Sequence, residues 1–190
     1  MKALLSILFI CTLAGCAAQM DAFAGLGVIN EEVSTFDNKR VVSVSPTWVA
    51  SDGTLGVAST KIGAIWNESN PNDVLIIMKH DGSTAYSTDV YKSYDSLGVN
   101  IDGDIRTFKV SGSTEHTSSN YNTVSRSIYT ESTATVNMPL DYLRKMVTGN
   151  TVTVRFNSTH RYEDGIFSKE TGTMDQQMAK ARIIEFLKQI

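Results

Sequence analysis

The side chains best suited to acid–base chemistry or metal binding are three histidines, His80, His116 and His160. A zinc site on one element needs ligands at helix or strand spacing, and no pair of these histidines has it. His80 is followed by Asp81 in a predicted turn, and His160 lies close to Glu163. We therefore predict turn and surface histidines, with a metal or catalytic site as the less favoured alternative.

Short catalytic motifs are missing from the sequence as well. It has no Gly-x-Ser-x-Gly elbow, no Ser-x-x-Lys pair, no glycine-rich phosphate loop and no His-Glu-x-x-His motif. We therefore predict no catalytic, cofactor-binding or metal-binding residue, and we favour a protein that is not an enzyme.

A calcium loop is a second candidate, because Asn100, Asp102 and Asp104 surround Gly103. The EF-hand pattern needs an acidic ligand six residues beyond its glycine, and Lys109 stands there. Asp-Gly instead suits a two-residue turn with positive φ at both positions, which predicts a β-hairpin over residues 97–110. Its register pairs Ile101 with Asp104, Val99 with Arg106 and Leu97 with Phe108.

Aromatic side chains in the first half of the chain are candidates for a contact patch, since Trp and Tyr dominate binding hot spots. They are Trp48, Trp66, Tyr86, Tyr91 and Tyr94. Aromatic residues in strands more often lie in the core or pair across strands, so we favour the core for Trp66.

Both cysteines, Cys11 and Cys16, lie near the start of the chain. The stretch around them begins with the positive charge of Lys2, continues as a short apolar run and ends in small residues. This pattern is typical of a secretory signal peptide and is too short for a stable membrane span.

The end of this stretch, Leu13-Ala14-Gly15-Cys16, resembles the lipobox of bacterial lipoproteins. The resemblance implies an S-diacylglycerol group on Cys16, cleavage between Gly15 and Cys16, and N-acylation of the new amino group. Two or three acyl chains give stable attachment, whereas one chain binds a membrane only marginally. The alternative is an ordinary secreted protein with a chance cysteine near its cleavage site.

Within that family, an Asp directly after the lipidated cysteine tends to retain Gram-negative members at the inner membrane. Ala17 occupies the position here, so the resemblance implies the outer membrane if the source is Gram-negative. Cleavage would leave the folded domain without a thiol or disulfide, so that its core alone must stabilise it.

Chain length and net charge limit the number of domains and the kinds of binding partner. A chain of 190 residues suits one domain, and a net charge of −3 without a basic run gives no sign of nucleic-acid binding. We expect a signal peptide over residues 1–15, a lipidated cysteine and tether over 16–27, and one β-rich domain over 28–190.

Runs of strand-forming residues between turn residues predict a mainly β domain. The expected strands cover residues 33–36, 40–49, 57–66, 74–78, 85–91, 97–101, 104–110, 123–129, 132–138, 151–157 and 162–167. The apolar run 74–78 is the best candidate for the middle of the core. Pro46 removes one ladder donor, so its strand should be an edge or be bent there.

Two helices are expected to pack on the sheet. Pro139 opens one over about 139–148, and Gly149 is placed to end it in the left-handed conformation. Thr173 and Gln176 form a capping box for the other, over about 173–190. The predicted fold is α+β, mainly β, either an antiparallel β-sandwich or a strongly curved sheet.

Two functions fit these expectations. The first is a membrane-anchored envelope lipoprotein, a non-enzymatic binding or assembly module in the periplasm or on the cell surface with an envelope protein as partner. The second is an envelope small-molecule or glycan binding protein or hydrolase with a cleft near His80 and His160. A deep pocket at these histidines would favour the second, and an exposed apolar or edge-strand surface would favour the first.

We expect the mature chain to begin at an acylated Cys16. Mass spectrometry of the native protein should find a lipidated N-terminal peptide, and Cys16→Ser should release the protein from membranes because both thioether and amide-linked chains are lost. An unmodified thiol at Cys16, or cleavage after Ala18, would contradict the expectation.

Overall fold

The computed structural model describes residues 25–51, 57–85, 89–170 and 178–190. The predicted leader, Cys16 with most of the tether, Tyr86, and the capping box of Thr173 and Gln176 lie outside these residues. Among the residues that the structure describes, no helix combines the length and apolar character needed to cross a bilayer.

Strands make up most of the described chain, which confirms the mainly β class. They are β1 Ile29–Val33, β2 Arg40–Ser51, β3 Val57–Asn67, β4 Asp73–Ser83, β5 Tyr94–Ile101, β6 Asp104–Lys109, β7 Glu115–Ser118, β8 Tyr129–Pro139, β9 Val152–Ser158 and β10 Tyr162–Ser168. Helix α2 spans Leu140–Thr148, and helix α3 spans Met178–Leu187.

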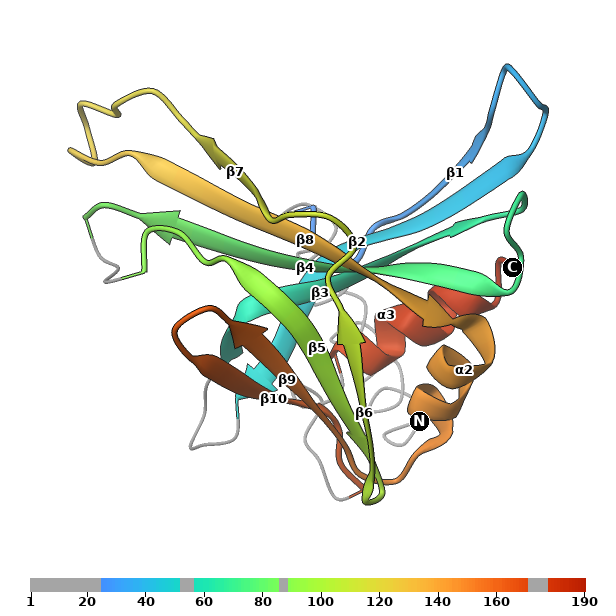
Figure 1. The fold of residues 1–190 in the computed structure, drawn as a ribbon. Helices are drawn as coiled ribbons and strands as arrows, with labels where there is room; N and C mark the ends of the chain where they lie inside the picture. The colour runs from blue at the N-terminus through green and yellow to red at the C-terminus, as the bar shows by residue number, and fades with distance from the viewer. Residues whose placement is uncertain (1–24, 52–56, 86–88, 171–177) are drawn as a thin grey trace, which may run out of the picture.

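The strands form one antiparallel sheet that curls into a half-barrel (Figure 1). Their order is β6-β5-β9-β10-β2-β3-β4-β8-β7, with β1 paired to β2. The chain leaving β6 reaches the other end of the sheet, where Val110 pairs with Val136 of β8. Where the chain leaving β6 meets β8, Tyr142 of α2 packs on Phe108 of β6, with 5.1 Å between ring centroids. Of the two predicted forms, the strongly curved sheet is therefore observed.

Strand β2 joins the two halves of the curl. It pairs with β1 and β3, and its last residues, Ala50 and Ser51, pair with β10. The register with β3 shifts between Val44 and Thr47, on either side of Pro46. Because proline cannot donate a ladder hydrogen bond, the strand bends at this point, as the sequence predicts.

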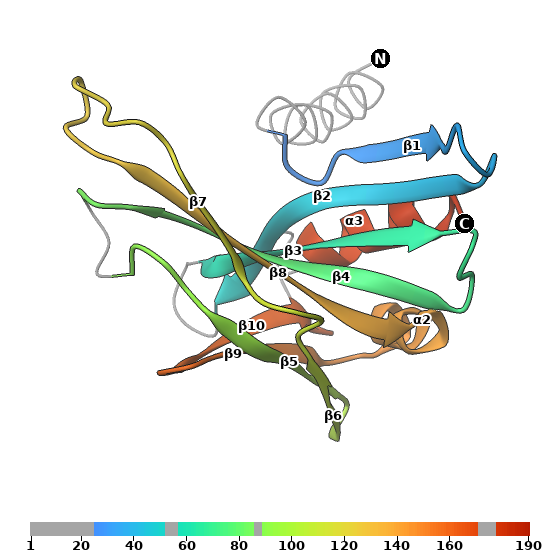
Figure 2. The ribbon, with the colours of Figure 1, turned by 45° about the horizontal axis from the view of Figure 1, so that its top comes forward.

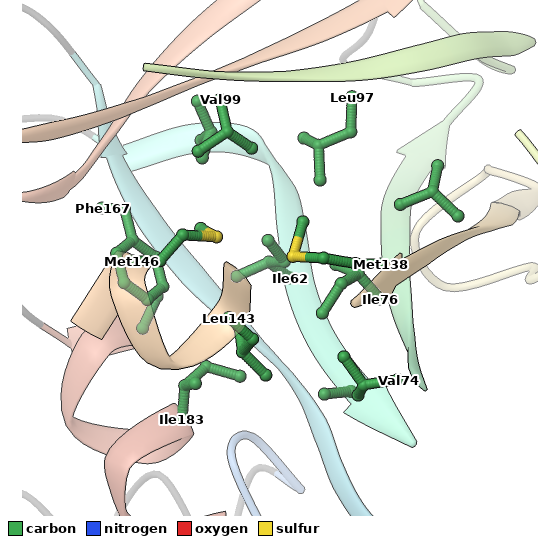
Figure 3. Close-up of a cluster of buried hydrophobic side chains, with 14 of the residues drawn as sticks. Ile62, Val74, Ile76, Leu97, Val99, Met138, Leu143, Met146, Phe167 and Ile183 are labelled. Carbon is green, nitrogen blue, oxygen red and sulfur yellow. The ribbon is translucent and has the colours of Figure 1, made fainter. Parts of the chain in front are cut away.

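The core lies on the concave face of the sheet, where both helices cover one end of the curl (Figure 2). Figure 3 shows Leu143 and Met146 of α2 and Ile183 of α3 in one apolar cluster with Ile76 and Met138 from the sheet. None of these five side chains is more than 1% exposed. Packing of the last helix on the domain's own sheet is thus confirmed.

The hairpin of β5 and β6 has the predicted register, with Ile101 opposite Asp104 and Leu97 opposite Phe108. Asp102 and Gly103 have φ values of 52° and 100°, as a two-residue turn of this kind requires.

Four predictions about local strands and turns are wrong. The strand expected over 33–36 is instead β1, Ile29–Val33, and residues 35–37 form the turn to β2. The expected turn at His80-Asp81-Gly82 is strand, because β4 continues to Ser83 and pairs with β8 along its whole length. The partner strand supplies ladder hydrogen bonds that outweigh the poor strand preference of Asp and Gly. The expected strands 85–91 and 123–129 are not formed in the described residues, where β5 begins at Tyr94 and residues 123–126 form a turn.

Helix α2 follows Pro139 as predicted, but a left-handed end at Gly149 is wrong. Gly149 has φ −64° and ψ 146°, an extended conformation. A Cβ there would lie 2.7 Å from Val152 Cγ2 and 2.8 Å from Ile101 Cγ2. Lack of space, rather than φ, accounts for glycine at this position.

The burial of α3 can be tested with two phenylalanines. Phe186 in α3 is 0% exposed, whereas Phe36 in the β1–β2 turn is 100% exposed. We expect Phe186→Ala to lower the free energy of unfolding by about 3–5 kcal/mol, because it removes apolar contacts and leaves a cavity. Phe36→Ala, the matched control, should change it by less than about 0.5 kcal/mol. Equal urea midpoints for the two variants would contradict the packing of α3.

Candidate functional site

The enclosed face of the sheet changes from apolar to polar along its strands. On β4 the buried row continues from the apolar residues into His80 and Gly82, and on β8 it continues into Ser132 and Thr130. His80 is 3% exposed, Ser132 is 0% exposed and Thr130 is 5% exposed. A buried polar cluster therefore fills the end of the curl that α2 and α3 leave uncovered.

Residues 89–92, called the crossing segment below, lie against this part of the sheet. Three sheet side chains bind its backbone: His80 Nε2 lies 3.0 Å from the Asp89 carbonyl, Thr130 donates to the Val90 carbonyl, and Ser132 Oγ accepts the Lys92 N–H at 3.0 Å. A Cβ at Gly82 would overlap with the Val90 carbonyl oxygen. His80, Thr130 and Ser132 thus supply partners for backbone groups of the crossing segment, which is not part of a strand.

An ion pair joins the crossing segment to β10. Lys92 Nζ lies 2.8 Å from Glu163 Oε2, and the side chains are 9% and 25% exposed. The Glu163 carboxylate also accepts the Ser59 N–H at 2.6 Å and the Thr60 hydroxyl at 2.8 Å. Thr60 Oγ1 lies 2.9 Å from the Tyr94 hydroxyl. One carboxylate therefore connects β3, β10 and the crossing segment, and reaches β5 through Thr60.

The protonation states of this cluster follow from its surroundings. Burial by itself raises the pKa of Glu163, but hydrogen bonds from Lys92, Ser59 and Thr60 outweigh burial and lower the pKa overall. Burial raises the pKa of the Tyr94 hydroxyl. Glu163 is thus ionised and Tyr94 is neutral near neutral pH, and the ion pair acts as a fixed cross-link.

Both ring nitrogens of His80 face backbone carbonyl oxygens. Nδ1 lies 3.2 Å from the Ser59 oxygen, and Nε2 lies 3.0 Å from the Asp89 oxygen. Burial, the largest effect, lowers the pKa of His80, and the charge of Lys92 lowers it further; the Ser59 hydrogen bond and the charges of Glu163 and Asp81 oppose the shift. A neutral imidazole carries one N–H, so it can donate to only one of the two carbonyls at a time.

A pocket of about 560 Å³ lies beside this cluster, between the crossing segment and the turn that joins β9 to β10. Lys92 and His160 are among its lining residues. The Thr159 N–H donates to the Ser93 carbonyl at 3.1 Å, and Arg161 forms an ion pair with Asp89. The pocket therefore lies between two segments that are held to one another.

The prediction of turn and surface histidines is wrong for His80, which lies in strand β4, whereas His116 and His160 are exposed. His80 is buried, and the exposed His160 lines the pocket. His116 Nδ1 lies 3.1 Å from Ser132 Oγ, and its ring meets the Tyr91 ring edge-on at 5.2 Å. Within the described residues, no group of three or more His, Cys, Asp or Glu side chains is placed to hold a metal ion.

The carboxylates around Gly103 are occupied within the fold. Asp102 accepts the N–H groups of Thr151 and Asn150 at 2.7 and 3.1 Å, which lowers the pKa of Asp102. Asp104 lies 2.8 Å from Lys145 Nζ. These contacts agree with the predicted hairpin rather than with the calcium loop.

The candidate aromatic patch is divided between core and surface. Trp66 is 8% exposed and Tyr94 is 5% exposed, whereas Tyr91 is 46% exposed. Trp48 is partly buried, and Lys61 Nζ lies 4.4 Å from the centroid of its ring. The core assignment of Trp66 is confirmed.

Sequence reasoning missed Lys92 and did not recognise the role of Glu163. The two residues are 71 positions apart and belong to no motif. The signal in the sequence was a change from apolar to polar residues at alternate positions of two strands, at His80 in β4 and at Thr130 and Ser132 in β8.

Comparisons with known proteins identify no relative: no protein-family model, no curated protein and no solved structure matches this chain.

The buried His80 predicts how stability depends on pH. Its pKa is lowered in the folded state, so between that value and the ordinary 6.5 the unfolded chain binds more protons. Stability should therefore fall as the pH drops below about 6.5, and fall further below the ordinary 4.5 of Glu163, whose pKa is also lowered.

Urea midpoints measured at about pH 7.5 and about pH 5.5 test this dependence. His80→Gln should make the difference between the two midpoints smaller, because the titrating group is gone. His160→Gln changes an exposed histidine and should leave the difference as in the wild type. An unchanged difference in His80→Gln would contradict the prediction.

Proposed function

We propose that this chain is a lipid-anchored protein of the cell envelope, at the outer membrane if the source is Gram-negative, and that its domain binds another envelope protein without catalysing a reaction. The lipobox resemblance at Cys16 supports the anchor. The observation that carries the binding role is the exposed apolar surface at the tips of two hairpins.

These hairpins are β1–β2 and β7–β8, and they extend to opposite sides of the molecule (Figures 1 and 2). Phe36 in the first turn is 100% exposed, and Val124 in the second is 92% exposed. Each hairpin end also carries a second exposed apolar or aromatic residue, Val33 at 54% and Tyr121 at 58%. Exposed apolar residues that are gathered, rather than single, favour a protein interaction site. In the described sheet β7 is also an end strand, with backbone groups on one side available to a further strand.

The buried polar cluster supports a binding role over catalysis. The Glu163 carboxylate accepts hydrogen bonds from Lys92, Ser59 and Thr60, and both His80 nitrogens face backbone oxygens. A general base needs a lone pair directed at a substrate proton. The Glu163 oxygens already accept hydrogen bonds from the protein, and both His80 nitrogens face backbone carbonyl oxygens rather than a substrate.

A second candidate function is binding or hydrolysis of a small molecule or glycan of the envelope. The pocket of about 560 Å³ favours it, because Lys92, His160 and Arg161 line that pocket. His80 is not among the lining residues, although its Nε2 lies 3.0 Å from the carbonyl oxygen of Asp89, which is one of them.

Site-specific photo-crosslinking in intact cells tests the proposal. A photoreactive residue at position 36 or 124 of the full-length protein should give a discrete crosslinked complex. The same residue at position 137 is the matched control, because Asn137 is exposed on β8 away from both tips. Cys16→Ser should abolish the complex by releasing the anchor. Crosslinks at neither tip, or equal crosslinks from position 137, would contradict the proposal.

A further inference from the structure

A groove of about 430 Å³ crosses β6, β5, β9 and β10 on the outer face of the sheet. This face is opposite to the core, because Val99 of β5 and Val154 of β9 turn their buried side chains inward. Side chains that line the groove include Asn100, Thr107, Thr153, Arg155 and Asn157, and Gly98 forms its floor. The elements that build it are separate from the two hairpin tips.

The floor is open because Gly98 has no side chain. In the register, Gly98 lies between Thr107 of β6 and Arg155 of β9. A Cβ at Gly98 would have its nearest neighbours at 3.4 Å, the Arg155 Cβ, and 3.7 Å, the Arg155 carbonyl oxygen, which are ordinary contacts. Packing therefore does not require glycine here, and what glycine provides is the depth of the groove.

The groove contains one pair of charges, and they neutralise each other. Arg155 Nε and Nη2 donate to the two carboxylate oxygens of Asp164 at 2.6 and 2.7 Å. This bidentate pairing engages the guanidinium in the geometry that it would offer to a phosphate or carboxylate ligand. A free anion would have to displace Asp164, so the groove is poorly suited to anionic ligands.

The other polar groups of the groove are neutral amides and hydroxyls. Asn157 Nδ2 donates to Ser96 Oγ at 3.0 Å, and Asn100 Oδ1 accepts the Gly103 N–H at 2.9 Å. These bonds hold both amides in a fixed orientation. Thr107 and Thr153 add hydroxyls that can both donate and accept. Such a set matches a ligand that carries many uncharged hydroxyl or amide groups.

Apolar surface flanks these polar groups. Ile105 is 69% exposed and lines the groove, and Tyr162 is 60% exposed. The Tyr162 ring lies against Arg155, with 4.0 Å from the guanidinium carbon to the ring centroid, so the aromatic surface is held beside the groove. Sugar rings present both hydroxyl edges and apolar C–H faces, and they need both kinds of surface.

From this combination we propose that the outer groove over Gly98 binds a neutral oligosaccharide. The sugar hydroxyls contact the asparagine and threonine side chains, and an apolar sugar face packs on Ile105 or Tyr162. The ligand approaches the β5 backbone at Gly98, where any side chain would occupy its place.

Calorimetric titration of the full-length protein with chitotetraose and with maltotetraose tests the proposal, and amide chemical shifts locate the contact. We expect binding of at least one of these neutral tetrasaccharides, with shift changes at Gly98 and Arg155. Gly98→Val should abolish binding because its side chain fills the floor. Asn157→Ala should weaken it about tenfold by removing one polar contact. Asn137→Ala changes an exposed asparagine elsewhere on the sheet and should leave the affinity unchanged.

Several outcomes would overturn the proposal. One is binding of neither tetrasaccharide by the wild type at millimolar concentration. Another is unchanged affinity in a Gly98→Val protein whose urea midpoint shows that it is folded. Loss of binding in His160→Ala, with Gly98→Val unaffected, would move the saccharide to the pocket beside Lys92. None of these results depends on crosslinking at the hairpin tips, so the protein-binding role is tested separately.

Discussion

Curling the sheet encloses one of its faces, and each polar group on that face needs a partner once water is excluded. At one end the two helices cover this face with apolar side chains. At the other end the face is polar, and there Lys92, Glu163 and the hydroxyls around them pair with one another. The half-barrel thus has an apolar end and a polar end, and the crossing segment belongs to the second.

Under the proposed functions, this division separates stability from recognition. The apolar core stabilises the domain, and the ion pair of Lys92 and Glu163 fixes the crossing segment against the sheet. The hairpin tips and the outer groove contribute little to that core, so their side chains can be selected for binding. The hairpin tips and the outer groove are both carried by strands of the one sheet.

Most of the strands, helix α2 and the packing face of α3 could be predicted because each depends on residues close together in the sequence. The Asp102-Gly103 turn sets the register of its hairpin through backbone conformation alone. Pro46 bends β2 because the missing N–H is a property of the residue itself. The candidate site was predicted poorly, because its cross-link joins positions 92 and 163 through the closure of the sheet.

The sequence by itself therefore determined the β-rich class, the register of the β5–β6 hairpin and the bend in β2, all of which depend on local conformation. The hairpin's place at one end of the sheet, rather than at its centre, was decided by the tertiary structure. The tertiary structure alone decided that the strand containing His80 continues, since its partner β8 supplies the hydrogen bonds. It likewise decided that Gly149 is extended and that a Cβ there would meet Ile101 of β5 and Val152 of β9. Long-range contacts can override local preference, and a single sequence does not show which contacts will form.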